Sequence, residues 1–215
     1  MSSTPEDNRA SESVLDLVPV MPVAVLDRVD DAVPLAKALV AGGLPAIELT
    51  LRTPVAIEAI RAIANDVPEI VVGAGTITTA LQASAAADAG AGFLVSPGAT
   101  ASLLAAMSET TLPYLPGTAT VSEVMAVLET GVSEMKFFPA ESAGGIAYLK
   151  SLASPLPQAR FCPTGGITVD TAPQYLALPN VGCVGGSWLT PADAVAAGDW
   201  ARIESLARDA ATLRT

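Results

Sequence analysis

Lys136 is the side chain in this sequence best suited to covalent chemistry. Residues 135–139 read Met-Lys-Phe-Phe-Pro, so this lysine lies in an apolar segment. An ammonium group is costly to desolvate, and a lysine in such a segment pairs with a carboxylate, reaches water or serves in catalysis. Desolvation favours the neutral form of an amine, and a neutral amine can attack a ketone to form a Schiff base. A structural ion pair and a catalytic amine both remain open.

Two further ionisable residues follow a neighbouring apolar run. Glu48 alternates with Ile47 and Leu49, so its side chain is expected on the opposite face of a strand. It could neutralise Lys136 or Arg52, and it could also transfer protons; the two roles are compatible. Arg52 could offer a bidentate fork to a substrate carboxylate or could cap its own loop.

Two glycine-rich segments near the C-terminus could bind an anion. Gly165-Gly166 and Gly185-Gly186-Ser187 each follow a predicted strand. Backbone N–H groups in such loops can surround a phosphate, and glycine lets the backbone approach it closely. Tight turning of the chain is the alternative explanation. Two such loops after successive strands favour a phosphate site.

The elements that must position these residues are short apolar strands alternating with Ala- and Leu-rich helical segments. Strand centres recur about every 23 residues along the sequence, a β-α alternation that predicts a parallel sheet. The predicted strands are residues 18–26, 46–51, 70–73, 92–95, 112–115, 134–137, 159–161 and 182–184. The predicted helices are residues 31–41, 54–65, 79–89, 101–108, 121–129, 145–152 and 169–178, with two more within 191–213.

Eight β/α units favour an α/β fold of the (β/α)₈ TIM-barrel type, with a doubly wound open sheet as the alternative. We expect one barrel domain over residues 17–215, preceded by a polar segment at 1–16. Residues 5–17 could form an extra N-terminal helix that covers the floor of the barrel. In such barrels the chemistry lies where strands end, which is where the candidate residues fall.

Composition narrows the range of partners. The net charge of −11 and the absence of Lys/Arg clusters argue against nucleic acid and anionic membranes. The N-terminus lacks the basic start and apolar core of a signal peptide, so a cytoplasmic protein is expected. The chain has no histidine, and its two cysteines, Cys162 and Cys183, lack metal-ligand spacing. We therefore expect neither a metal nor a cofactor.

Six motifs, in this order and spacing, resemble those of the bacterial 2-keto-3-deoxy-6-phosphogluconate (KDPG) aldolases, which also act on 4-hydroxy-2-oxoglutarate (KHG). The resemblance covers residues 17–215. The motifs are residues 48–52 (Glu-Leu-Thr-Leu-Arg), 73–76 (Gly-Ala-Gly-Thr), 96–98 (Ser-Pro-Gly), 136–140 (Lys-Phe-Phe-Pro-Ala), 160–166 (Arg-Phe-Cys-Pro-Thr-Gly-Gly) and 185–189 (Gly-Gly-Ser-Trp-Leu).

The resemblance implies a homotrimeric class I aldolase without a metal. By resemblance, Lys136 is the Schiff-base lysine and Glu48 the general acid/base. The other residues implied to bind substrate are Arg52, Thr76, Pro97 and Phe138 around the pyruvate part, and Thr164, Gly165, Gly166, Gly185, Gly186 and Ser187 around the remainder and its phosphate.

Three other functions remain compatible with the residues: a phosphosugar epimerase, a metal-dependent pyruvate aldolase, and a phosphosugar-binding barrel without activity. The preference between KDPG and KHG, and the stereochemistry at C4, are likewise left open.

Overall fold

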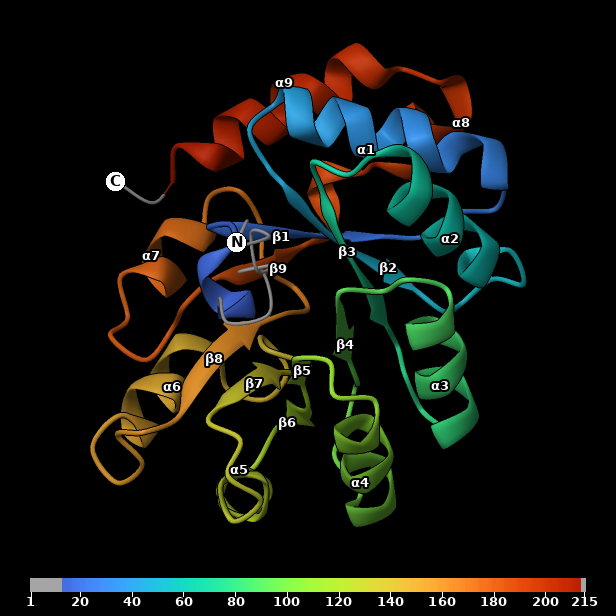
Figure 1. The fold of residues 1–215 in the computed structure, drawn as a ribbon. Helices are drawn as coiled ribbons and strands as arrows, with labels where there is room; N and C mark the ends of the chain where they lie inside the picture. The colour runs from blue at the N-terminus through green and yellow to red at the C-terminus, as the bar shows by residue number, and fades with distance from the viewer. Residues whose placement is uncertain (1–12, 214–215) are drawn as a thin grey trace, which may run out of the picture.

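The computed structural model describes residues 13–213, in which short parallel strands alternate with helices. Each strand except β5, which leads into β6, is followed by a helix, and the strands gather at the centre of the molecule (Figure 1). The strands are β1 (Val20–Ala24), β2 (Ala46–Thr50), β3 (Val71–Gly75), β4 (Phe93–Val95), β5 (Tyr114–Leu115), β6 (Gly117–Thr118), β7 (Glu134–Phe137), β8 (Arg160–Pro163) and β9 (Val184–Gly186).

Parallel pairing carries these strands around a closed ring. Six are paired in the order β5-β4-β3-β2-β1-β9, and three in the order β6-β7-β8. Isolated parallel bridges, Phe161 to Val181 and Thr164 to Gly185, join β8 to the β9 segment. On the other side of the ring, β5 and β6 are separated only by Pro116. The predicted (β/α)₈ barrel is therefore confirmed, and the open-sheet alternative is wrong.

The fifth predicted strand, residues 112–115, corresponds to β5, and a second short strand, β6, follows it beyond Pro116. Proline has no backbone N–H to donate to a neighbouring strand, so the ladder is interrupted there. Its carbonyl still accepts a hydrogen bond from the Lys136 N–H at 3.0 Å. β5 consequently pairs with β4, and β6 with β7, so one strand position serves both halves of the ring.

Helices surround the strands and follow one another around the outside, with α9 returning beside α1 (Figure 1). The helix predicted at 169–178 is shorter, because hydrogen bonds between Thr168 and Thr171 form a turn before it starts. The two helices predicted within 191–213 are confirmed. The helices are α1 (Ala32–Ala41), α2 (Ala56–Asp66), α3 (Ala80–Asp88), α4 (Ala101–Glu109), α5 (Val121–Leu128), α6 (Gly145–Leu152), α7 (Ala172–Leu176), α8 (Ala192–Ala197) and α9 (Trp200–Ala211).

The chain before β1 covers the amino ends of the strands. The helix predicted at 5–17 falls mainly on residues 1–12, outside the described residues. From Val14 to Asp16 the chain forms only a short 3₁₀ turn, η2. Leu15 in this turn is fully buried, and a Cβ added at Gly182 would lie 2.5 Å from the Leu15 Cβ. Glycine at 182 therefore lets η2 pack directly against the segment that enters β9.

Candidate active site

Lys136 and Glu48 meet inside the barrel. The Nζ atom of Lys136 donates a hydrogen bond to Glu48 Oε1 at 3.1 Å, and their side chains are only 6% and 2% exposed. β7 and β2 are not neighbours in the ring, so this contact crosses the interior. A buried charge is stable only when it is paired or well hydrogen-bonded. The ion pair, one of the two alternatives from the sequence, is therefore present, and the reactive amine stays a prediction.

Glycines on β3 make room for the Glu48 side chain and its neighbour. A Cβ at Gly75 would lie 2.2 Å from Glu48 Oε1, and a Cβ at Gly73 would lie 2.2 Å from the Phe93 ring. Glu48, Gly73 and Phe93 are partners in register on successive strands, so all three face the interior. The Gly-Ala-Gly sequence of this strand is therefore a steric requirement of the buried carboxylate.

The aromatic ring of Phe138 lies between the lysine and a glycine loop. Its centroid is 5.3 Å from Lys136 Nζ, within the range of a cation–π interaction. A Cβ at Gly165 would lie 3.4 Å from the Phe138 Cδ2 and Cε2 atoms. Phe138 thus connects the reactive amine to the loop after β8.

The predicted glycine loops lie side by side at the carboxyl ends of β8 and β9. Thr164 and Gly185 form a parallel bridge, and a Cβ at Gly185 would lie 2.2 Å from Thr164 Oγ1. Gly165 and Gly166 have φ values of +103° and +82°, which side chains other than glycine rarely adopt. Ser187 follows directly and begins the 3₁₀ turn η4 (Ser187–Leu189).

The remaining candidates also follow strand ends. Arg52 is exposed after β2, and its guanidinium has no hydrogen-bond or ion-pair partner within residues 13–213. Thr76 follows β3 with φ of 62°, a left-handed conformation that is strained for a β-branched residue. Pro97 follows β4, and its backbone lies 2.3 Å from the position of a Cβ at Gly117, the register partner of Lys136. All the predicted site residues therefore belong to one rim of the barrel.

Three further residues shape this rim: Ser96, which the sequence analysis placed in a motif without a role of its own, and Glu141 and Tyr175, which it missed. Ser96 Oγ accepts the Gly117 N–H at 3.3 Å and donates to the Gly98 carbonyl at 2.8 Å, which fixes the loop after β4. Glu141, after β7, accepts a hydrogen bond from the Tyr175 hydroxyl of α7. The Pro-Ala-Glu sequence after the lysine motif signals a loop at Glu141, but nothing local points to Tyr175.

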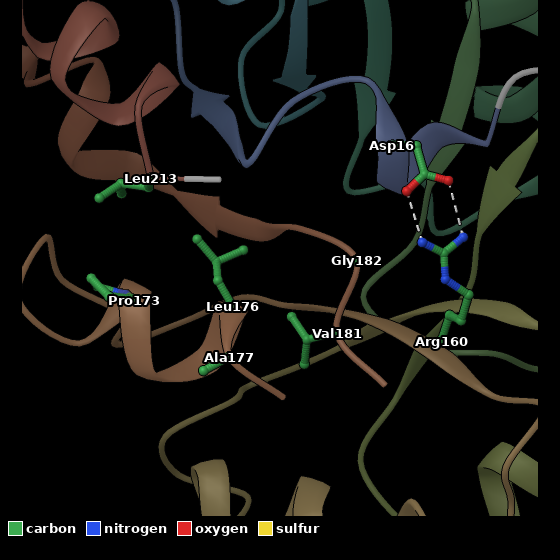
Figure 2. A pocket seen from close by; sticks show the side chains of 8 residues that line it. All are labelled: Asp16, Arg160, Pro173, Leu176, Ala177, Val181, Gly182 and Leu213. Carbon is green, nitrogen blue, oxygen red and sulfur yellow. Dashed lines mark hydrogen bonds and ion pairs between the residues drawn. The ribbon is translucent and has the colours of Figure 1, made fainter. Parts of the chain in front are cut away.

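A cavity of about 500 Å³ lies at the opposite end of the barrel (Figure 2). Arg160, which lines it, is the first residue of β8 and stands in register with Glu134, the first residue of β7. Asp16 approaches from η2 and binds the Arg160 guanidinium through both carboxylate oxygens, at 2.8 and 3.1 Å. None of the predicted site residues lines this cavity.

From residue 13 to 213, His, Cys, Asp and Glu side chains form no group of three or more that could hold a metal ion. Over the same residues no helix has the length and apolar character needed to cross a membrane.

Comparison with known proteins identifies the family. The family model for KDPG and KHG aldolase matches residues 11–206. The KHG/KDPG aldolase of Escherichia coli is 53% identical over 201 residues, which cover 94% of both chains. The chain belongs to the KDPG and KHG aldolase family. The family expected from the six motifs is confirmed, and with it a carbon–carbon lyase of the Schiff-base class.

Two solved aldolase structures show the same fold at high similarity. KDPG aldolase from Legionella pneumophila, with pyruvate captured at low pH as a covalent carbinolamine intermediate, superposes with a TM-score of 0.91 at 46% identity, covering 93% of this chain and 97% of that one. The KDPG aldolase of Zymomonas mobilis with 3-phosphoglycerate has a TM-score of 0.88 at 50% identity, covering 93% and 94%. The family therefore includes members caught with pyruvate and with a phosphorylated acid.

Proposed function

We propose that this aldolase cleaves KDPG to pyruvate and glyceraldehyde 3-phosphate, and KHG to pyruvate and glyoxylate. The observation that carries the proposal is the buried contact of 3.1 Å between Lys136 Nζ and Glu48 Oε1 at the rim of the barrel. It joins a nucleophile to a proton acceptor within hydrogen-bond distance, as covalent catalysis requires. The Legionella relative supports the same chemistry, because pyruvate is bound there as a carbinolamine.

The first step forms the Schiff base. Lys136 gives up a proton, for which Glu48 Oε1 is the acceptor in contact, and the neutral amine attacks C2 of the 2-oxo acid. Glu48 then returns this proton to the hydroxyl of the carbinolamine, which leaves as water to give an iminium, and Glu48 is again a carboxylate. The aromatic face of Phe138, 5.3 Å from Nζ, stabilises positive charge at this nitrogen.

The second step breaks the C3–C4 bond. Its electron pair moves into the iminium to give an enamine, while Glu48, directly or through water, takes the proton of the C4 hydroxyl. The aldehyde leaves with the new C4 carbonyl. The enamine is then protonated at C3, and water releases pyruvate and restores Lys136.

Binding of the substrate rests on two groups of residues. Arg52 has no partner within the described chain and can neutralise the substrate carboxylate with a bidentate fork, beside Thr76 and Pro97. At the other end, Gly165, Gly166, Gly185, Gly186 and Ser187, together with Thr164, receive the phosphate through backbone N–H groups and hydroxyls. The phosphorylated acid in the Zymomonas relative supports a phosphate site.

Reductive trapping tests the central assignment. Borohydride added with pyruvate should attach one pyruvate unit irreversibly to Lys136, identified by peptide mass spectrometry. An adduct on Lys37 or Lys150, or no adduct, would refute it. Turnover that persists in EDTA separates this mechanism from the metal-dependent aldolase and the epimerase. Pyruvate release separates it from a barrel that only binds.

The preference between the two substrates is tested by measuring kcat/KM for KDPG and KHG side by side, with the galactonate epimer of KDPG as the probe of C4 stereochemistry. The proposed phosphate site predicts a lower KM for KDPG.

We further propose a cytoplasmic homotrimer in which residues 17–215 form the catalytic domain. Sedimentation equilibrium measures the trimer directly.

A further inference from the structure

One part-buried hydrogen bond near the proposed phosphate site, between buried Tyr175 and exposed Glu141, is not used by the mechanism. The hydroxyl of Tyr175, on α7, donates to Oε1 of Glu141 in the loop after β7. Tyr175 is fully buried. Burial and the neighbouring carboxylate raise the pKa of the Tyr175 hydroxyl, so it keeps its proton and remains a donor at neutral pH.

The loop after β8 lies against the segment that carries Glu141. The Ala140 N–H donates to the Thr164 carbonyl at 2.8 Å, and the Glu141 N–H donates to the Gly165 carbonyl at 3.1 Å. These bonds continue the β7–β8 ladder beyond both strands. The two loops therefore hold a fixed position relative to one another, and Gly166 lies next to Glu141.

The side chain of Glu141 turns its methylene groups, and not its charge, toward Gly166. A Cβ at Gly166 would lie 2.7 Å from the Glu141 Cγ and 2.8 Å from its Cβ, with no carboxylate atom within 4 Å. At Gly145 the same construction lies 3.0 Å from the Tyr175 hydroxyl and 3.8 Å from both Glu141 carboxylate oxygens. The carboxylate thus points away from the glycine loop, toward Tyr175 and the start of α6.

We propose that Tyr175 is a positioning residue for the phosphate end of the substrate, because its hydroxyl holds the Glu141 carboxylate away from the Gly165-Gly166 loop. The proposal rests on the phosphate site of the proposed function. A carboxylate released from Tyr175 could rotate toward Gly166, where it would repel a phosphate and compete for the backbone N–H groups. A substrate without a phosphate would not feel this change.

The test is Tyr175→Phe, which removes one oxygen atom and keeps the buried ring. We expect KM for KDPG to rise about tenfold, the cost of losing one charge-assisted hydrogen bond. The kcat for KDPG, and both constants for KHG, should stay within about twofold of the unmodified protein. Tyr148→Phe is the matched control. The Tyr148 ring stacks on Phe137 with a centroid distance of 5.7 Å, and loss of its hydroxyl should change neither KM nor kcat for either substrate.

Rescue separates electrostatics from folding. In the double variant Tyr175→Phe/Glu141→Gln, the released side chain carries no charge, so KM for KDPG should return to within about twofold of the unmodified protein. A KM that stays high in the double variant, an equal rise for both substrates, or an unchanged KM in Tyr175→Phe would overturn the proposal. Failure of the unmodified protein to cleave KDPG or to trap pyruvate would instead refute the proposed function.

Discussion

The two ends of the barrel each carry a cation paired with carboxylates, and the two arrangements differ in kind. At the carboxyl ends of the strands, Lys136 has Glu48 as its one ion-pair partner among residues 13–213, and both side chains are almost fully buried. At the amino ends, Arg160 binds both Asp16 and Glu134, with the three side chains 39%, 52% and 22% exposed. The two cations lie on adjacent strands, β7 and β8.

The two pairs differ in whether their cation can take part in a reaction. Arg160 is a permanently charged fork, and the hydrogen bond to Asp16 raises the pKa of its guanidinium further, so this cluster can only hold elements together. In the proposed mechanism Lys136 loses a proton to Glu48 and becomes a nucleophile. The structural pair is therefore half exposed, whereas the pair assigned to the chemistry is almost fully buried.

The largest effect is expected when the Lys136–Glu48 pair is broken at the lysine. Lys136→Met should lower kcat/KM for KDPG by at least about 10⁴-fold and abolish borohydride trapping of pyruvate, because no amine remains to form the imine. It also leaves Glu48 buried without a cation, which should lower the free energy of unfolding by about 3–5 kcal/mol. Steady-state kinetics and urea denaturation measure the two effects.

Lys136→Arg is the control for folding, because it keeps a cation opposite Glu48 but has no nucleophilic amine. We expect it to be as inactive as Lys136→Met while retaining more stability. Substantial turnover in either variant would show that the two ends of the barrel do not differ as argued.

The second effect removes the charge of the carboxylate while keeping its shape. Glu48→Gln should slow KDPG cleavage by about 10²–10⁴-fold, the usual contribution of a general acid/base. Trapping of pyruvate on Lys136 should remain detectable, because the amine is still present. Single-turnover measurements separate imine formation from cleavage, and full turnover in this variant would remove Glu48 from the mechanism.

The site at the carboxyl ends of the strands could be predicted from the sequence, because the patterns that mark it lie within short segments of the chain. Strand ends mark the rim, and the alternation around Glu48 predicts an interior side chain. What the local pattern lacks is the steric partner: Gly75 is needed because Glu48 Oε1 occupies the position of its Cβ. The short strand β6 beyond Pro116 was likewise missed, because the predicted fifth strand ends at residue 115, before the proline that interrupts the ladder.

The cluster at the amino ends of the strands could not be predicted, because its contacts join distant parts of the chain. Arg160 meets Asp16 across 144 residues, and no periodic pattern links them. At the opposite end, the rim, the Tyr175–Glu141 bond likewise spans 34 residues and depends on how α7 packs against the loop after β7. Such contacts follow from the closed ring itself, so they can be recognised only after the fold is known.

The third prediction concerns the cluster of Arg160, Asp16 and Glu134. Arg160→Met should lower the free energy of unfolding by about 1–2 kcal/mol, because Asp16 and Glu134 lose a shared cation at a half-exposed site. The kcat/KM for KDPG should stay within about threefold, since nothing at the rim is altered. Chemical denaturation and kinetics on the same sample test this contrast. A loss of activity comparable to that of Glu48→Gln would mean that the two ends are coupled.

The smallest effect sharpens the contrast through salt. Asp16→Asn removes one of the two carboxylates on Arg160 and should lower the free energy of unfolding by about 0.5–1 kcal/mol in 0.1 M salt. Because this pair is half exposed, the difference should shrink at 1 M salt, where the screening length falls to about 3 Å. The cost of Lys136→Met should change little over the same range, because Glu48 and Lys136 are shielded from the solvent ions. If salt reduced the loss of unfolding free energy equally in Asp16→Asn and Lys136→Met, the contrast between a half-exposed pair and a buried pair would be wrong.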